Sequence, residues 1–106
     1  MSKDYEEFIE KNITKSNEVI EKDIHVSIDI SMYPNQEDFI PPIKGFIKEI
    51  NKYKDLKIIT FPTSTVVQGD YDHAMDSIKQ TIASCHKRFN NAVYIIKVIP
   101  DYKALD

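Results

Sequence analysis

Glycine and cysteine are scarce in this sequence of 106 residues, and tryptophan is absent. The two glycines, Gly45 and Gly69, lie far apart, so the chain has no glycine-rich loop of the kind that cradles phosphate groups. The single cysteine, Cys85, cannot form a disulfide within the chain, so the sequence does not call for an oxidising compartment. We therefore expect a cytoplasmic protein that folds without covalent cross-links.

Basic residues are not in excess either, since the formal net charge is −3. Residues 1–23 hold four lysines and seven acidic residues, and the rest of the chain is balanced at ten of each sign. Because nucleic-acid binding needs a basic surface to neutralise phosphates, we do not expect a nucleic-acid partner. The acidic N-terminus has no uninterrupted apolar run, so we predict neither a signal peptide nor insertion into a membrane.

The composition is that of an ordinary globular domain, with 42% hydrophobic and 29% charged residues. Residues 1–22 are predicted to form a helical arm, because Tyr5, Phe8, Ile9 and Ile13 recur at helical spacing. That apolar stripe either packs on the body or a second subunit, or docks another protein. Residues 23–106 are predicted to form the single folded domain.

Residues 24–33 alternate strictly between apolar and polar side chains, which predicts a strand with one buried and one polar face. The apolar set is Ile24, Val26, Ile28, Ile30 and Met32, and the other set is His25, Ser27, Asp29, Ser31 and Tyr33. Apolar residues at helical spacing predict a helix over residues 38–54, provided that Pro41 and Pro42 lie in its first turn.

Two β-branched segments, residues 56–61 and 63–68, are separated only by Pro62, so we expect two antiparallel strands joined by a tight turn. Asp70 is a suitable N-cap for a second helix over residues 71–88, whose last turn is basic. Residues 92–99 are nearly all apolar, which is typical of a strand buried on both faces.

This order of elements predicts an α+β fold, the ferredoxin-like βαββαβ sandwich, with a four-stranded antiparallel sheet and two helices on one face. The other face is then left uncovered. It would present Val93, Ile95 and Ile99 of the last strand beside Lys97, and such a row is too apolar to remain exposed. We therefore expect self-association through the sheet, into a homodimer or a homotetramer.

Three stretches resemble the YkoF-like thiamine/hydroxymethylpyrimidine-binding family. They are Ser31-Met32-Tyr33-Pro34, Asp38-Phe39-Ile40, and Ser64-Thr65-Val66-Val67-Gln68-Gly69-Asp70, and they occur in the family's order. The resemblance implies a single-domain member that binds thiamine or its hydroxymethylpyrimidine moiety, in thiamine or pyrimidine salvage or transport. Two departures stand out: family members can carry two such domains in tandem, and Gln68 occupies a position where related proteins often carry glutamate.

An aminopyrimidine site needs a few hydroxyl or carboxylate groups and an aromatic wall. The candidate binding residues are Ser31, Tyr33, Ser64, Thr65, Asp29 and Gln68. The first four lie at the ends of the two strands that are central in this fold. For the serines, the threonine and Tyr33, the alternative is an ordinary structural role, and Asp29 is at least as well explained by an ion pair with Lys97 on an adjoining strand.

The three histidines are far apart in sequence and Cys85 lies in an apolar stripe, so we expect no metal site, no cofactor and no nucleophilic cysteine. No acid/base pair or activated nucleophile is visible, and an enzyme acting on a pyrimidine is the least favoured interpretation. The leading hypothesis is a ligand-binding protein. The alternative is a ligand-free regulatory or assembly protein that oligomerises through its sheet.

Overall fold

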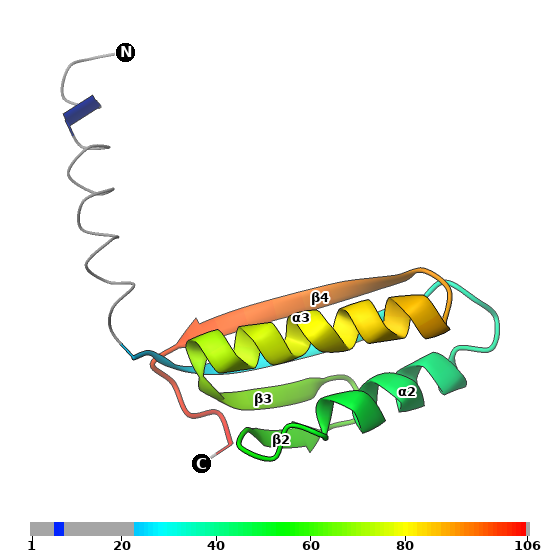
Figure 1. Ribbon diagram of the computed structural model, residues 1–106, viewed down its shortest axis with the longest axis horizontal. Coiled ribbons are helices and arrows are strands. Elements are labelled where there is room, and N and C mark those ends of the chain that lie inside the picture. Colours follow the sequence, from blue (N-terminus) through cyan, green and yellow to red (C-terminus); the bar gives the residue numbers. More distant parts are fainter. Residues whose placement is uncertain (1–5, 8–22, 106) are drawn as a thin grey trace.

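A four-stranded antiparallel sheet with two helices packed on one face forms the body of the protein (Figure 1). The structure is a computed structural model and describes residues 6–7 and 23–105. The strands are β1 (His25–Pro34), β2 (Lys57–Thr60), β3 (Thr65–Asp70) and β4 (Ala92–Pro100), and the helices are α2 (Ile40–Ile50) and α3 (Tyr71–Arg88). Apart from residues 6–7, the predicted N-terminal arm lies outside the described residues, so the boundary at residue 23 stays a prediction.

The strand order is β2-β3-β1-β4, and every neighbouring pair is antiparallel. Two crossovers produce this order: α2 links β1 to β2, and α3 links β3 to β4. The predicted ferredoxin-like βαββαβ fold is thereby confirmed, with β1 and β3 at the centre of the sheet.

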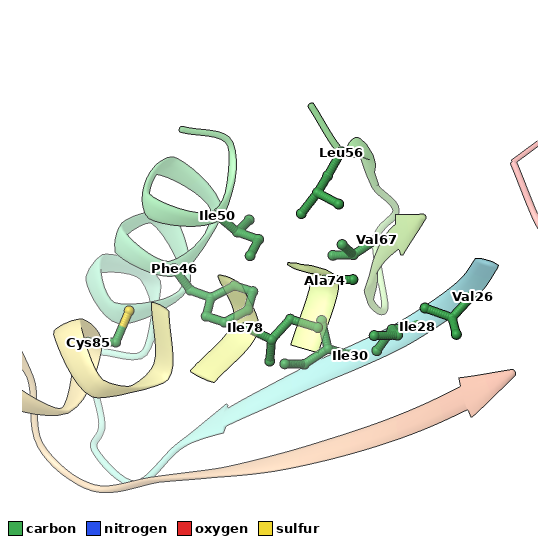
Figure 2. Packing of buried hydrophobic residues seen from close by; sticks show 10 residues of the cluster. All are labelled: Val26, Ile28, Ile30, Phe46, Ile50, Leu56, Val67, Ala74, Ile78 and Cys85. Atoms are coloured by element: carbon green, nitrogen blue, oxygen red, sulfur yellow. The ribbon is translucent and has the colours of Figure 1, made fainter. Parts of the chain in front are cut away.

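The hydrophobic core lies between the sheet and the two helices (Figure 2). Alternation along β1 sends Val26, Ile28 and Ile30 into it, while the residues between them point to the other side. The buried cluster consists of Val26, Ile28, Ile30, Phe46, Ile50, Leu56, Val67, Ala74, Ile78 and Cys85. We call the covered side of the sheet the helix face and the opposite side the open face.

Local sequence signals explain most helix ends. The backbone N–H of His73 donates to the Asp70 carboxylate at 3.1 Å, which confirms the predicted N-cap of α3. Pro41 and Pro42 lie in the first turn of α2, as expected. That helix ends at Ile50 rather than at the predicted residue 54, because the following main chain tightens into bonds three residues apart, including Tyr53 N–H to Ile50 C=O at 3.3 Å.

The prediction that the last strand is buried on both faces is wrong for the single chain. Among the strands of the described residues, β4 is an edge strand whose neighbour is β1. It remains substantially exposed on both faces, at Val93, Ile95, Ile96, Val98 and Ile99. The register nevertheless confirms which residues share a face: Tyr94, Ile96 and Val98 lie opposite Met32, Ile30 and Ile28 of the helix face.

The chain after β4 turns back at one end of the sheet, toward β2 (Figure 1). It lies on the open-face side there, because it bonds to Ser27 and Gln68. A positive φ of 56° at Asp101 makes the turn, and the backbone N–H of Asp101 donates to the carbonyl of His25. Residues 101–105, which we call the C-terminal tail, then reach side chains of β1, β3 and β2 in succession. One end of the open face is therefore covered by the protein's own chain.

Candidate functional site

A small cavity lies on the helix face, between α2 and the turn that joins β2 to β3. Its volume is about 170 Å³. The residues lining it are Ile30, Met32, Ile43, Phe46, Ile47, Thr60, Phe61, Pro62, Thr63, Ser64 and Thr65. The walls are thus apolar and partly aromatic, and the polar groups are concentrated on the side of the hairpin.

Hydroxyl groups at the hairpin form the polar side of this cavity. Thr60 and Thr65 are directly paired across β2 and β3, and their Oγ1 atoms lie 3.2 Å apart. Thr65 is only 4% exposed, whereas Thr60 is exposed. A tight turn, in which the backbone N–H of Phe61 donates to the carbonyl of Ser64 at 2.7 Å, brings the two strands together. Because a hydroxyl both donates and accepts hydrogen bonds, this pair can bond to either a donor or an acceptor on the edge of a heterocyclic ring.

The cavity lining contains neither an acidic nor a basic side chain, in the part of the chain that the structure describes. A buried charge is stable only when it is paired. The site is therefore suited to an uncharged group, and it offers no counter-charge to a phosphate or to a cationic ring held inside it.

The predicted binding residues fall on two different faces of the sheet. Ser64 and Thr65 line the cavity on the helix face. Asp29, Ser31 and Tyr33 of β1 lie on the open face, because they alternate with the buried residues of that strand. Gln68 lies there too, since it pairs with Ser27 of β1. The expected cluster therefore does not form one pocket in the single chain.

Each open-face candidate has its own surroundings. The hydroxyl of Ser31 donates to the carbonyl of Thr63 at 3.1 Å, which ties β1 to the hairpin turn. Gln68 is buried under the C-terminal tail, where its Oε1 accepts from the backbone N–H of Leu105 at 2.9 Å. Tyr33 is 55% exposed. A pyrimidine held in the cavity would reach none of these three side chains through the sheet.

Thr60 is a cavity residue that the sequence analysis missed. The signal was present, because Thr60 lies two residues after Ile58 in a strand and so shares its face. Five residues separate Thr60 from Thr65, and a hairpin with Pro62 in its turn brings these two positions opposite each other. The hydrophobic wall from α2 could not be assigned in the same way, because it depends on how the helix lies over the sheet.

Two groups with shifted pKa values lie in the core. Burial raises the pKa of the Cys85 thiol, which keeps it protonated and unreactive. Burial also raises the pKa of Tyr94 to about 12. Neither residue lines the cavity. Among the residues that the structure describes, no group of three or more histidine, cysteine or acidic side chains is placed to hold a metal ion, and no helix is long and apolar enough to span a bilayer.

Comparison with known proteins supports the architecture. The model of the YKOF-related family matches residues 25–97. A candidate thiamine biosynthesis/salvage protein from Thermotoga maritima is 24% identical, with a TM-score of 0.67 over 76% of this chain and 85% of the other. A Streptococcus pneumoniae protein is 18% identical, with a TM-score of 0.66 over 76% and 89%. A hypothetical protein from Methanocaldococcus jannascii is 24% identical, with a TM-score of 0.64 over 77% and 84%. A search of curated proteins found no match.

Proposed function

Because the chain belongs to the YKOF-related family, we propose that it binds thiamine or its hydroxymethylpyrimidine moiety, with the pyrimidine in the cavity beside Thr60 and Thr65. The observation that carries this proposal is the chemistry of the cavity: an apolar and aromatic wall faces a pair of hydroxyls, and no charged group intervenes. The Thermotoga maritima protein of the same fold, named for thiamine biosynthesis or salvage, supports the same ligand class.

The size of the cavity favours a single ring. Sites for drug-sized ligands hold roughly 300–1,000 Å³, and this one holds about 170 Å³. The pyrimidine therefore enters, while the thiazolium of thiamine stays at the mouth near Phe61, which is 45% exposed. An exposed aromatic ring is suited to contact a cationic heterocycle there.

The proposal is of a binding protein rather than an enzyme, acting in thiamine or pyrimidine salvage or transport. Its support is that no group lining the cavity can act as a general acid or base at neutral pH. A second candidate function, ligand-free assembly or regulation, is favoured by one observation: the apolar side chains of β4 are exposed in the single chain. In both cases we propose a dimer or tetramer.

Titration calorimetry with hydroxymethylpyrimidine, thiamine and thiamine diphosphate tests the binding site. Thr65→Val keeps the shape of the side chain and removes its hydroxyl, which should cost about 1–3 kcal/mol of binding free energy, or roughly a fivefold to hundredfold loss of affinity. Thr81→Val is the matched control, because Thr81 is also buried but bonds to Ser77 within α3, outside the cavity.

Three results would discriminate between the alternatives. Equal affinity of wild type and Thr65→Val would remove Thr65 from the site. Tighter binding of thiamine diphosphate than of hydroxymethylpyrimidine would contradict the uncharged cavity as the main site. Absence of binding by all three compounds to a folded protein would leave assembly or regulation as the function.

A further inference from the structure

The turn between β2 and β3 forms a wall of the cavity but lies outside the strand ladder. The two strands pair as far as Thr60 and Thr65, so residues 61–64 belong to neither strand. All four line the cavity, and the first three are exposed. Pro62 also has no backbone N–H with which to fix the turn. The position of this wall therefore depends on the contacts that other elements make with the turn.

Ser31 of β1 makes such a contact from the open face. The register of β1 and β3 ends at Ile30, one residue before Ser31. Beyond that point a side chain takes over from the ladder, because the hydroxyl of Ser31 donates to the carbonyl of Thr63 at 3.1 Å. The next residue, Met32, alternates to the helix face and lines the cavity. Two successive residues of β1 thus contact the turn on one side and the cavity on the other.

We propose that Ser31 is a positioning residue for this cavity: its hydroxyl holds the turn so that Phe61 meets the thiazolium of thiamine at the mouth. This inference rests on the proposed function, because it requires a ring in the cavity. The two rings of thiamine then depend on different parts of the hairpin. The pyrimidine meets Thr60 and Thr65, which the strand ladder places, whereas the thiazolium meets Phe61, which the turn places. Ser31 therefore favours thiamine over free hydroxymethylpyrimidine.

Removal of this hydroxyl should have a small but selective effect. The bond between Ser31 and Thr63 is exposed, so water competes with it and its contribution lies at the lower end for hydrogen bonds. Ser31→Ala should lower the affinity for thiamine about two- to fivefold, and that for hydroxymethylpyrimidine less than about twofold. Ser31 lies outside the buried core, so the stability of the fold should hardly change. The ratio of the two affinities then reports the position of the turn.

Titration calorimetry of the full chain with thiamine and hydroxymethylpyrimidine measures this ratio. Ser31→Thr keeps a hydroxyl on the strand and should restore the ratio of wild type. Ser27→Ala is the matched control, because Ser27 lies on the same strand and face but bonds to the C-terminal tail instead of the turn; it should leave the ratio unchanged. Since Ser31 pairs with Ile95 of β4, the variants are compared at concentrations at which sedimentation velocity gives all of them the same mass.

Amide hydrogen exchange at Phe61 tests the position of the turn without a ligand. The N–H of Phe61 donates to the carbonyl of Ser64 at 2.7 Å within the turn, so its exchange should become faster in Ser31→Ala and return to the wild-type rate in Ser31→Thr. An unchanged affinity ratio in Ser31→Ala, or a ratio that Ser31→Thr does not restore, would overturn the proposal. If wild type binds neither compound, the proposed function fails instead. The exchange at Phe61 then decides alone whether Ser31 holds the turn, and an unchanged rate would show that it does not.

Discussion

The helix face and the open face of the sheet are both rich in β-branched residues, but the two faces use them differently. On the helix face, Ile28 and Val67 pair across β1 and β3 and are fully buried beneath the helices. On the open face, Val93 and Ile95 are more than half exposed, and one carboxylate oxygen of Asp29, Oδ1, is buried without a hydrogen-bond partner. The helix face is thus buried at its centre in one chain and exposed along β4, at Ile96 and Val98, whereas the open face carries its most exposed apolar side chains away from the tail.

The cavity of the proposed ligand lies on the helix face, and the exposed apolar side chains through which we propose association lie mainly on the open face. The proposed ligand and the proposed second chain would therefore contact different residues and would not compete for them. The proposed association would also explain why a strand as apolar as β4 can lie at an edge, since its exposed side chains would then be covered by a second chain.

The largest effect that tests this comparison is a matched pair of truncations, Ile28→Ala and Ile95→Ala. Ile28 is fully buried, so its truncation should lower the free energy of unfolding by about 2–5 kcal/mol. Ile95 is 51% exposed, so its truncation should cost the single chain less than about 1 kcal/mol. Urea unfolding at several protein concentrations measures both effects.

Protein concentration sharpens the contrast between the two variants. The cost of Ile28→Ala should be the same at every concentration at which the protein is monomeric. The cost of Ile95→Ala should grow as concentration rises, because association stabilises only the folded chain. If the two truncations cost the same amount in dilute solution, the open face would be part of the core and the comparison would fail.

The sequence predicted the two faces of β1 and β4 better than it predicted the site. Alternation from Val26 to Met32 is enough to assign faces along β1, and Asp70 is enough to begin α3. Which candidate residues lie together depends on the register between β1 and β3. A shift of one residue in that register would move each side chain to the opposite face relative to its partner strand. Thr65 pairs with Ile30 and not with Ser31, so the two residues that were expected together lie on opposite sides.

The C-terminal tail could not have been predicted from the pattern of residues 101–106, which has no periodicity. Four hydrogen bonds to the sheet use its main chain, through the N–H groups of Ala104 and Leu105 and the carbonyls of Tyr102 and Leu105. Main-chain groups are present in every residue, so they leave no signal in the sequence. The burial of Ser27 and Gln68 on an otherwise exposed face is the structural sign of this contact.

Ser27→Ala should have a smaller effect than the core truncation and should act on the tail. It removes the acceptor for the N–H of Ala104 and the donor to the carbonyl of Tyr102, at a cost of about 1–2 kcal/mol. Amide hydrogen exchange at Ala104 and Leu105 should become faster. Ser31→Ala is the control on the same strand and face, since the hydroxyl of Ser31 bonds to Thr63 instead. Unchanged exchange in Ser27→Ala would show that the tail is held by other contacts.

The smallest predicted effect is a change in how stability depends on acidic pH. It involves two side chains at the surface of the helix layer rather than on either face of the sheet. Asp55, in the turn after α2, lies 2.8 Å from Nε2 of His73 in the first turn of α3. The hydrogen bond from His73 lowers the pKa of the Asp55 carboxyl below its ordinary value of 3.8. The folded protein therefore holds this carboxylate ionised at a pH at which the unfolded chain would protonate it.

Because folding lowers the pKa of Asp55, acid should reduce the stability of the folded protein. The contribution of Asp55 to stability is fully present above pH 3.8 and is lost as the pH falls through the lowered pKa of the folded state. Urea unfolding between about pH 2 and 5 should therefore show a slightly steeper loss of stability in wild type than in Asp55→Asn. Because Asp55 is exposed, added salt should reduce the difference. Parallel pH profiles at low salt would show that the pair does not fasten α3 to the turn after α2, and that acid acts on the protein through other carboxylates.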